Sequence, residues 1–287
     1  MDTRFSTFLS LCSTLNYRKT AEDVHLSQPA VTKQIQSLEQ EYHTKLFVYK
    51  GRSFTLSDEG VLFKRFAESQ RYNEQELIFE LSSKPQFTLR LGATKSIGDS
   101  VLDTYLTSYL KQGNRNISLL VENTTVLLAQ LEAAQLDFIV LEGVFPKKHY
   151  AYRLLRREAF VGICSKNHPF AGKSIPVPLL QGQNLITREP GSGTRNIFEQ
   201  ELHSQGYDLS LFSRVTEISS FQPLKKLVSS GLGISFVYQS VVKSDPELAQ
   251  FSLSQMAREH EFNIVWLKNT AASRYVDAFF GFESPDI

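Results

Sequence analysis

The sequence is poor in several features that would by themselves point to a function. Its 287 residues include only two cysteines, Cys12 and Cys164, so neither a disulfide framework nor a cysteine-rich metal site is expected. Lysine and arginine total 31 against 30 aspartates and glutamates, and this balance excludes a strongly basic or acidic surface field. Any binding to a nucleic acid must therefore depend on where individual charges lie.

Long apolar runs and targeting segments are also absent. The longest uncharged apolar run, residues 234–242, is about half of the roughly 18 residues that a membrane-spanning helix needs. The first residues show no basic stretch followed by an apolar one, so no signal peptide is expected. These absences and the low cysteine content predict a soluble, cytoplasmic protein without a membrane partner.

The motifs of the common catalytic classes are missing as well. GxSxG, HExxH, GxGxxG, the phosphate-binding GxxxxGK[ST] and aspartate-rich metal loops do not occur, and the six histidines have no ligand spacing. We therefore expect no enzymatic activity, no catalytic residue, no metal and no cofactor. The composition is that of a globular protein, 41% apolar and 21% charged, and the length suits about two domains.

Three short helices are predicted at the N-terminus. Apolar residues at helical spacing mark the first, over about residues 5–15, and the second covers about 17–24. The apolar face of the first helix consists of Phe5, Phe8, Leu9, Cys12 and Leu15. Ser27 is a suitable N-cap for a third helix, and Pro29 lies in its first turn, where a missing N–H costs nothing. The inner face of the third helix consists of Val31, Ile35 and Leu38.

The third helix has a polar outer face. It carries Pro29, Lys33 and Gln36, with Ala30 and Thr32 at its flanks. Glutamine bonds adenine, lysine donates to guanine, and threonine or alanine contacts the thymine methyl in the major groove. A short helix, a tight turn and a second helix with such a face form a helix-turn-helix. Any amphipathic surface helix also has a polar face, and this plainer interpretation stays open.

A β-hairpin is predicted directly after these helices. Residues 46–49 and 54–56 read as strands around a glycine-containing turn. Lys50 and Arg52 at the tip would reach phosphate or the minor groove, or else form a solvated turn. A hairpin in this position makes the winged form of the helix-turn-helix.

Several short motifs occur in order over residues 5–60. They are Ala21-Glu22, Ser27-Gln28-Pro29-Ala30-Val31-Thr32-Lys33-Gln34-Ile35-Gln36-Ser37-Leu38-Glu39, Leu46-Phe47 and Thr55-Leu56-Ser57-Asp58-Glu59-Gly60. This series resembles the N-terminal signature of LysR-type transcriptional regulators. The resemblance implies a domain over residues 1–60 that binds double-stranded DNA as a dimer. It also implies contacts to base edges by Gln28, Pro29, Ala30, Thr32 and Lys33, and a contact to the backbone or the minor groove by Arg52.

The resemblance has one departure. Thr32 and Lys33 stand where serine and arginine are common in the family, which keeps the chemistry but leaves the preferred bases open.

A long helix is predicted next, and we assign residues 58–84 to it as linker and dimerisation helix. Ser57 caps it, and residues 61–81 contain neither glycine nor proline. One side carries Leu62, Phe66, Gln70 and Asn73. The apolar residues on this side are expected to be covered by another helix or by another part of the chain. The family resemblance implies the same helix of a second subunit, and packing on its own chain is the alternative.

From residue 87 onward, strands and helices alternate, which predicts an α/β region with a mostly parallel sheet. Two crossing strands, near residues 160 and 261, would divide residues 87–287 into two lobes. Lobe I would cover about 87–160 and 262–287, and lobe II about 161–261. The family resemblance implies a periplasmic-binding-protein-like effector-binding domain, and ligands in such sheets bind beyond the carboxyl ends of the strands.

Two stretches at such strand ends are candidates for effector binding. One places Thr94 and Ser96 before a helix, and the other places four residues between a strand and a helix: Gly191, Ser192, Gly193 and Thr194. The glycines allow backbone N–H groups to face a ligand, the helix dipole favours negative charge, and the hydroxyls donate. Together they predict a site for a carboxylate, phosphate or sulfur oxyanion, with an ordinary turn and N-cap as the alternative.

The run 188–195 also resembles a subgroup of the family that includes regulators of carbon fixation and of sulfur metabolism. In that subgroup Asn-Glu often stands where this chain has Phe221-Gln222, so the pocket wall is expected to differ.

The sequence thus predicts a homodimeric or homotetrameric regulator whose DNA binding is modulated by a small anionic metabolite. Two alternatives remain. The chain could be a small-molecule binding protein whose N-terminal module contacts another protein. It could also be an α/β enzyme acting in the cleft, which would need Ser192 or Thr194 for turnover.

Overall fold

A computed structural model of the chain describes residues 2–51, 53–82, 87–113, 115–243, 245–257 and 259–282. The chain forms two compact units. The first comprises residues 1–85, 132–134 and 267–273, and the second comprises 86–131, 135–266 and 274–287. Each unit has its own cluster of buried apolar residues.

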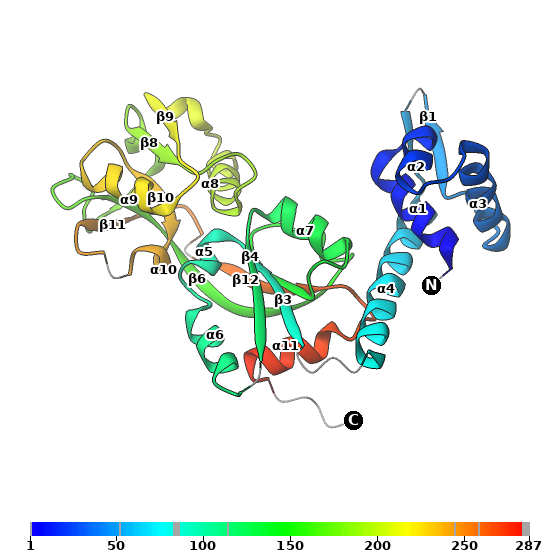
Figure 1. The fold of residues 1–287 in the computed structure, drawn as a ribbon. Helices are drawn as coiled ribbons and strands as arrows, with labels where there is room; N and C mark the ends of the chain where they lie inside the picture. Colours follow the sequence, from blue (N-terminus) through cyan, green and yellow to red (C-terminus); the bar gives the residue numbers. More distant parts are fainter. Residues whose placement is uncertain are drawn as a thin grey trace. The chain divides into compact units, whose positions relative to one another are not determined.

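The first unit contains three short helices, a hairpin and a long helix (Figure 1). These are α1 (Thr3–Thr14), α2 (Tyr17–Asp23), α3 (Gln28–Glu41), the pair β1 (Phe47–Lys50) and β2 (Ser53–Leu56), and α4 (Asp58–Leu81). Val31, Ile35 and Leu38 of α3 are buried, as predicted. Phe8 of α1 packs edge-on against Phe63 of α4, with ring centroids 4.9 Å apart. The winged helix-turn-helix predicted from the sequence is therefore confirmed.

A local side-chain hydrogen bond caps the start of each of these four helices. Ser27 Oγ accepts from the N–H of Ala30 at 3.3 Å, and Ser57 Oγ accepts from the N–H of Gly60 at 2.8 Å. The first helix ends earlier than expected, because Leu15 is its left-handed C-cap with φ 48°. Leu15 is 43% exposed, so its assignment to the apolar inner face was wrong.

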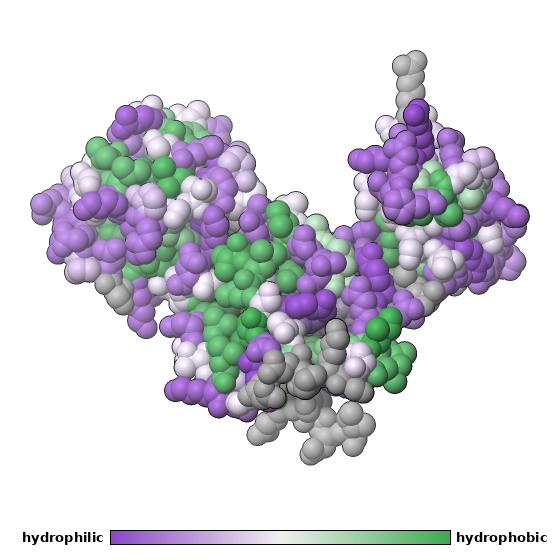
Figure 2. Space-filling view, in the orientation of Figure 1, coloured by the Kyte–Doolittle hydropathy of each residue, from purple (hydrophilic) through white to green (hydrophobic). Residues whose placement is uncertain are grey.

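Helix α4 has a buried side and an exposed apolar side. Phe63, Ala67 and Tyr72 are buried, and Phe63 and Ala67 belong to the apolar cluster of the first unit. The exposed apolar residues are Leu62, Phe66, Leu77, Ile78 and Leu81, and Figure 2 shows apolar surface at the C-terminal end of the helix. The side predicted to seek a partner is therefore uncovered at Leu62, Phe66 and Gln70, whereas Asn73 donates to the carbonyl of Asn269 at 2.9 Å.

The second unit is built on a mixed sheet. Its strand order is β4-β3-β5-β12-β6-β11-β7, β10 also pairs with β6, and β8 pairs with β9 in a separate sheet. The strands are β3 (Thr88–Ala93), β4 (Asn116–Val121), β5 (Phe138–Glu142), β6 (Ala151–Ser165), β7 (Ser174–Ile175), β8 (Asn184–Thr187), β9 (Arg214–Glu217), β10 (Ser235–Tyr238), β11 (Leu248–Leu253) and β12 (Glu259–Trp266).

The expectation of a mostly parallel sheet was wrong. β3 pairs in parallel with β4 and β5, and β8 with β9, but the crossing strands β6 and β12 run antiparallel to each other. They are also antiparallel to β5, β10 and β11. Alternation of strands and helices predicts the parallel units correctly, but it carries no information on the two long strands that connect them.

The helices of this region are α5 (Lys95–Gly98), α6 (Asp103–Leu110), α7 (Thr124–Glu132), α8 (Gly193–Ser204), α9 (Phe221–Ser229), α10 (Gln239–Val242) and α11 (Ala272–Phe280), with 3-10 turns η1 (Val177–Leu180) and η2 (Leu209–Leu211). Residues 99–102 separate α5 from α6, and Val101 and Leu102 are buried there. We use lobe I for β3, β4, β5, α5 and α6, and lobe II for β7 to β11 with α8, α9 and α10. No helix in the described part of the chain is long and apolar enough to span a membrane.

Candidate nucleic-acid interface and ligand site

The outer face of α3 is open to solvent. Gln28, Pro29, Lys33 and Gln36 are exposed, and Ala30 and Thr32 are half-buried. Within the described residues, Lys33 and Gln36 make no hydrogen bond or ion pair with another side chain of the chain. Long polar side chains on an exposed helix, free of internal partners, are available for base edges in a major groove.

The hairpin beside this helix is anchored by stacked aromatic rings. Phe54 of β2 stacks on Phe47 of β1 at 5.1 Å and lies 5.4 Å from the ring of Tyr17 in α2. Lys50, at the end of β1, is exposed. Arg52, the other basic residue predicted to contact DNA, lies outside the described residues. The stacked rings thus hold the hairpin against α2, and Lys50 is exposed on it.

The hydroxyl residues predicted to bind an effector come together in the second unit. Thr94 and Ser96 come from the end of β3 and from α5 in lobe I, whereas Ser192 and Thr194 come from the start of α8 in lobe II. All four are at most 4% exposed. Ser96 Oγ lies 2.9 Å from Thr194 Oγ1, so residues 98 positions apart in the sequence meet across the two lobes.

Sequence reasoning missed the acidic residue at the centre of this cluster. Glu142 ends β5 and is 2% exposed. Its carboxylate accepts hydrogen bonds from Thr94 Oγ1, from Ser96 Oγ at 3.2 Å and from Thr194 Oγ1 at 3.4 Å. Burial raises the pKa of Glu142, and the hydrogen bonds from Thr94 and Ser96 oppose that shift. A charged residue closing an otherwise apolar strand was the available signal.

The two predicted glycines have different surroundings. Gly191 has φ +86°, a left-handed conformation that favours glycine. Gly193 lies against Glu142, where a Cβ atom would stand 3.1 Å from both Cγ and Oε1 of the glutamate. The start of α8 therefore faces the Glu142 carboxylate at close range, which is favourable because the N-terminal end of a helix carries partial positive charge.

Arg188 is a second buried charge beside the cluster. It is 3% exposed, its Nε donates to Glu189 Oε2 at 2.9 Å, and its guanidinium lies 4.3 Å from the ring centre of Phe221. An arginine held by one carboxylate and one aromatic ring keeps part of its donor capacity for another acceptor.

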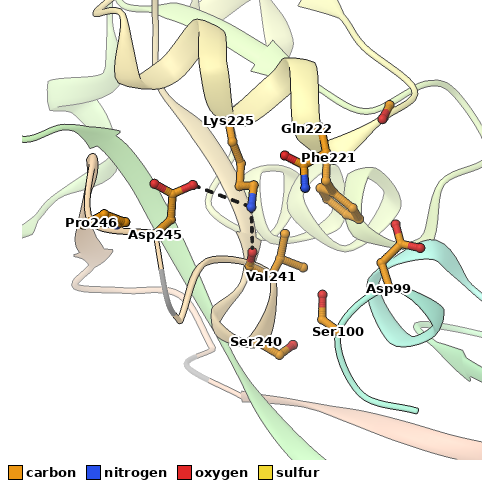
Figure 3. Close-up of a pocket in the computed structure, with 10 residues that line it drawn as sticks. Asp99, Ser100, Phe221, Gln222, Lys225, Ser240, Val241, Asp245 and Pro246 are labelled. Atoms are coloured by element: carbon orange, nitrogen blue, oxygen red, sulfur yellow. Dashed lines mark hydrogen bonds and ion pairs between the residues drawn. The ribbon is translucent and has the colours of Figure 1, made fainter. Parts of the chain in front are cut away.

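A larger cavity of about 610 Å³ opens next to these residues (Figure 3). Asp99 and Ser100, just after α5 in lobe I, form one wall, and Phe221 and Gln222 of α9 stand opposite. At the far end, Lys225 Nζ lies 3.6 Å from Asp245 Oδ2 and 3.5 Å from the carbonyl oxygen of Val241. This volume lies within the range of small-molecule sites.

Metal ligation and thiol chemistry find no support in the described residues. These contain no group of three or more histidine, cysteine or acidic side chains placed to hold a metal ion. Both cysteines are free thiols, and burial raises the pKa of Cys12 to about 12 and that of Cys164 to about 11. Thiols with such pKa values are poor nucleophiles.

Two domain models of one family together match most of the chain. Residues 3–61 match the bacterial regulatory helix-turn-helix proteins of the lysR family, and residues 82–282 match the LysR substrate binding domain. The chain therefore belongs to the LysR family of transcriptional regulators.

Named relatives and solved structures agree with this assignment. The transcriptional regulator CysL of Bacillus subtilis is 28% identical over 245 residues, which covers 83% of this chain and 81% of that protein. A probable RuBisCO transcriptional regulator of Thalassiosira pseudonana is 26% identical over 251 residues, covering 84% and 82%.

Full-length OxyR of Pseudomonas aeruginosa, solved as a variant with one substitution, has a similar fold, with a TM-score of 0.61, 20% identity and coverage of 99% and 98%. The regulatory domain of CcmR from Synechocystis PCC6803, in complex with 2-PG, has a TM-score of 0.61 and 21% identity, covering 68% of this chain and 96% of that one.

Proposed function

We propose that this LysR-family regulator reads DNA with α3 and responds to a small anionic metabolite bound between lobes I and II. The observation that carries the DNA-binding part is the outer face of α3, where Lys33 and Gln36 are exposed and free of internal partners. The residues that we assign to base edges are Gln28, Pro29, Ala30, Thr32, Lys33 and Gln36. Lys50 and Arg52 of the hairpin would contact phosphate or the minor groove.

The metabolite would bind where the two lobes meet. Thr94, Ser96, Ser192 and Thr194 supply hydroxyls there, and Gly191 and Gly193 shape the turn. The cavity of Figure 3 offers room for a ligand, and its wall includes Phe221, which contacts Arg188. The start of α8 favours a negatively charged group. The regulatory domain of CcmR, similar in fold, was solved in complex with 2-PG, which supports a small ligand in this class of domain.

We further propose that the protein acts as a homodimer or homotetramer in the cytoplasm and has no enzymatic activity. The exposed apolar side of α4 would face a second subunit. In this scheme residues 1–60 bind DNA, 58–84 link and dimerise, and 87–287 bind the effector.

The DNA-binding proposal is tested by fluorescence anisotropy with the intergenic DNA upstream of the protein's own gene. We expect salt-sensitive binding that Lys33→Ala weakens and that Lys111→Ala leaves unchanged, because Lys111 lies at the end of α6 in the second unit. Binding that is equally strong for the Lys33→Ala variant, or no binding at any salt concentration, would contradict the proposal.

A further inference from the structure

The hydroxyl cluster between the lobes already holds an anion. Three buried hydroxyls, those of Thr94, Ser96 and Thr194, donate to the carboxylate of Glu142. Two of these donors belong to lobe I and one to lobe II. The chain itself thus provides the acceptor that an anionic ligand would otherwise offer to these hydroxyls.

The carboxylate leaves no room beside it. The free volume that borders Glu142, Thr94, Ser192 and Gly193 is only about 10 Å³, roughly the minimum that one water molecule needs. A Cβ atom at Gly193 would stand 3.1 Å from the Glu142 side chain, so the start of α8 lies directly beside the carboxylate. A carboxylate or phosphate ligand can reach the hydroxyls only after this side chain has moved.

The two neighbouring cations bond to other groups, and Arg188 acts on Glu142 through its charge, which lowers the pKa of that carboxyl. Lys95 Nζ donates to the carbonyl of Ser219 at 2.9 Å. Arg188 donates to both carboxylate oxygens of Glu189, at 2.9 and 3.0 Å. No ion pair to Glu142 joins the described residues, so neutral hydroxyls are its direct partners. An arriving anion would therefore meet a like charge that no direct cationic partner neutralises, in a site of low dielectric constant.

We propose that Glu142 is an internal competitor that occupies the interlobe hydroxyl cluster, so that an anion binds there only by displacing its carboxylate. Glu142 thereby sets the affinity of the site for anions and ties lobe II to lobe I, through Thr194, while the site holds no ligand. This inference rests on the proposed function, because it assumes that the metabolite is an anion that engages the same hydroxyls.

The test measures sulfate binding to the full-length chain by calorimetry. Sulfate keeps its double negative charge throughout the neutral pH range, unlike phosphate. The variants are Glu142→Gln and, as a matched control, Glu122→Gln, because Glu122 lines the same small space without bonding to the hydroxyls. We expect Glu142→Gln to lower the Kd for sulfate at least about tenfold and Glu122→Gln to change it less than about threefold. An unchanged or raised Kd in Glu142→Gln would overturn the inference.

A measurement on the unaltered chain serves if the Glu142→Gln variant does not fold. Burial raises the pKa of Glu142, and its protonation removes the competing charge, so sulfate affinity should rise as the pH is lowered across the range in which the chain stays folded. The charged and titratable groups around Glu142 are Lys95, Glu122, Arg188, Glu189 and Tyr238. An affinity that stays constant or falls over this range would contradict the inference.

Anisotropy with the upstream DNA separates this inference from the proposed function. If specific DNA binding persists while Glu142→Gln gains no affinity for sulfate, the role proposed for Glu142 is contradicted and the proposed DNA-binding function is retained. If specific DNA binding is itself absent, the proposed function fails.

Discussion

Lys33 and Lys50 differ in the part of the DNA that each would reach. Lys33 lies on the outer face of α3, and Lys50 ends the first strand of the hairpin. Lys33→Ala should reduce discrimination at one base position by about 1–3 kcal/mol, because it removes a direct contact to a base edge. Lys50→Ala should weaken all sequences similarly and lower the dependence on salt by about one phosphate contact. Competition binding with single-base variants of the DNA site, repeated at several salt concentrations, distinguishes these outcomes. Equal loss for all bases in Lys33→Ala would contradict the assignment.

Thr194 is the hydroxyl that lobe II contributes to the cluster around Glu142. Thr194→Val keeps the side-chain shape but removes the donor, so Ser96 and Glu142 each lose one partner. We expect the free energy of unfolding to fall by about 1–2 kcal/mol and sulfate binding to weaken. Chemical denaturation and calorimetry measure the two effects. Ser204→Ala, at the exposed end of the same helix, is the control and should behave as the unaltered chain. Sulfate affinity that is unchanged in Thr194→Val would remove Thr194 from the site.

Individual residues were predictable from the sequence when their interaction partners lie close to them along the chain. The cap at Ser27 was predictable because its partner, the N–H of Ala30, is three residues away. The end of an apolar strand marked Glu142, but its role was not predictable, because its partners stand 46 to 52 positions away and its burial depends on the meeting of two lobes. An acidic residue at the end of a strand is more often solvated than buried.

Among the helices and strands, α4 has an exposed apolar side that is a candidate interface with a second subunit. Ile78 is 61% exposed and Leu77 is 54% exposed. Ile78→Glu should shift the protein towards monomer, because a charge in an apolar interface loses its hydration. Light scattering after size exclusion measures the mass. Gln75→Glu adds the same charge at an exposed polar position of α4 and should leave the mass unchanged. The assignment of this side to a second subunit is wrong if Ile78→Glu retains the mass of the unaltered chain.

Periodicity predicted most helices and strands to within a few residues, and its failures have physical causes. The break between α5 and α6 falls at residues 99–102, where Val101 and Leu102 are both buried. The short edge strand β7 and its neighbour β11 lack an apolar pattern strong enough to separate them from loops. Their pairing with each other and with β6 supplies the hydrogen bonds that define them.

At the scale of the whole molecule, the first unit is assembled from three separate segments. Helix α4 carries Lys64, whose Nζ lies 2.8 Å from Glu68 and 2.7 Å from Glu132. Ser69 Oγ donates to the carbonyl of Lys268 at 2.9 Å. The sequence predicted a linker helix with one apolar side. It could not show that residues 132–134 and 267–273 join this unit, because these contacts depend on tertiary packing.

The same cluster predicts how stability depends on pH. Glu68 is 3% exposed, and burial raises its pKa from 4.5 to about 7, although Lys64 opposes the shift. The folded state therefore binds a proton more tightly than the unfolded chain, so stability is full below about pH 4.5 and is lost as the pH rises towards 7. Glu68→Gln should raise the melting temperature at about pH 8 more than at about pH 5, by roughly 2–4 °C for each kcal/mol.

Thermal unfolding of the Glu68→Gln variant at the two pH values checks this expectation. Glu59→Gln, exposed in the first turn of α4, is the control. If Glu68→Gln changes the melting temperature equally at both pH values, folding does not shift the pKa of Glu68.

The close approach of Gly193 to Glu142 has a consequence for how related sequences diverge. A methyl group at position 193 would stand 3.1 Å from the glutamate side chain and 3.2 Å from the backbone oxygen of residue 142, so a larger residue there requires Glu142 to yield by a few tenths of an ångström. Glycine at position 193 should therefore accompany a glutamate at position 142. Homologues that retain both residues would form a subfamily whose metabolite has to dislodge a resident carboxylate, and homologues that have lost the glutamate should accept their metabolites at lower concentrations.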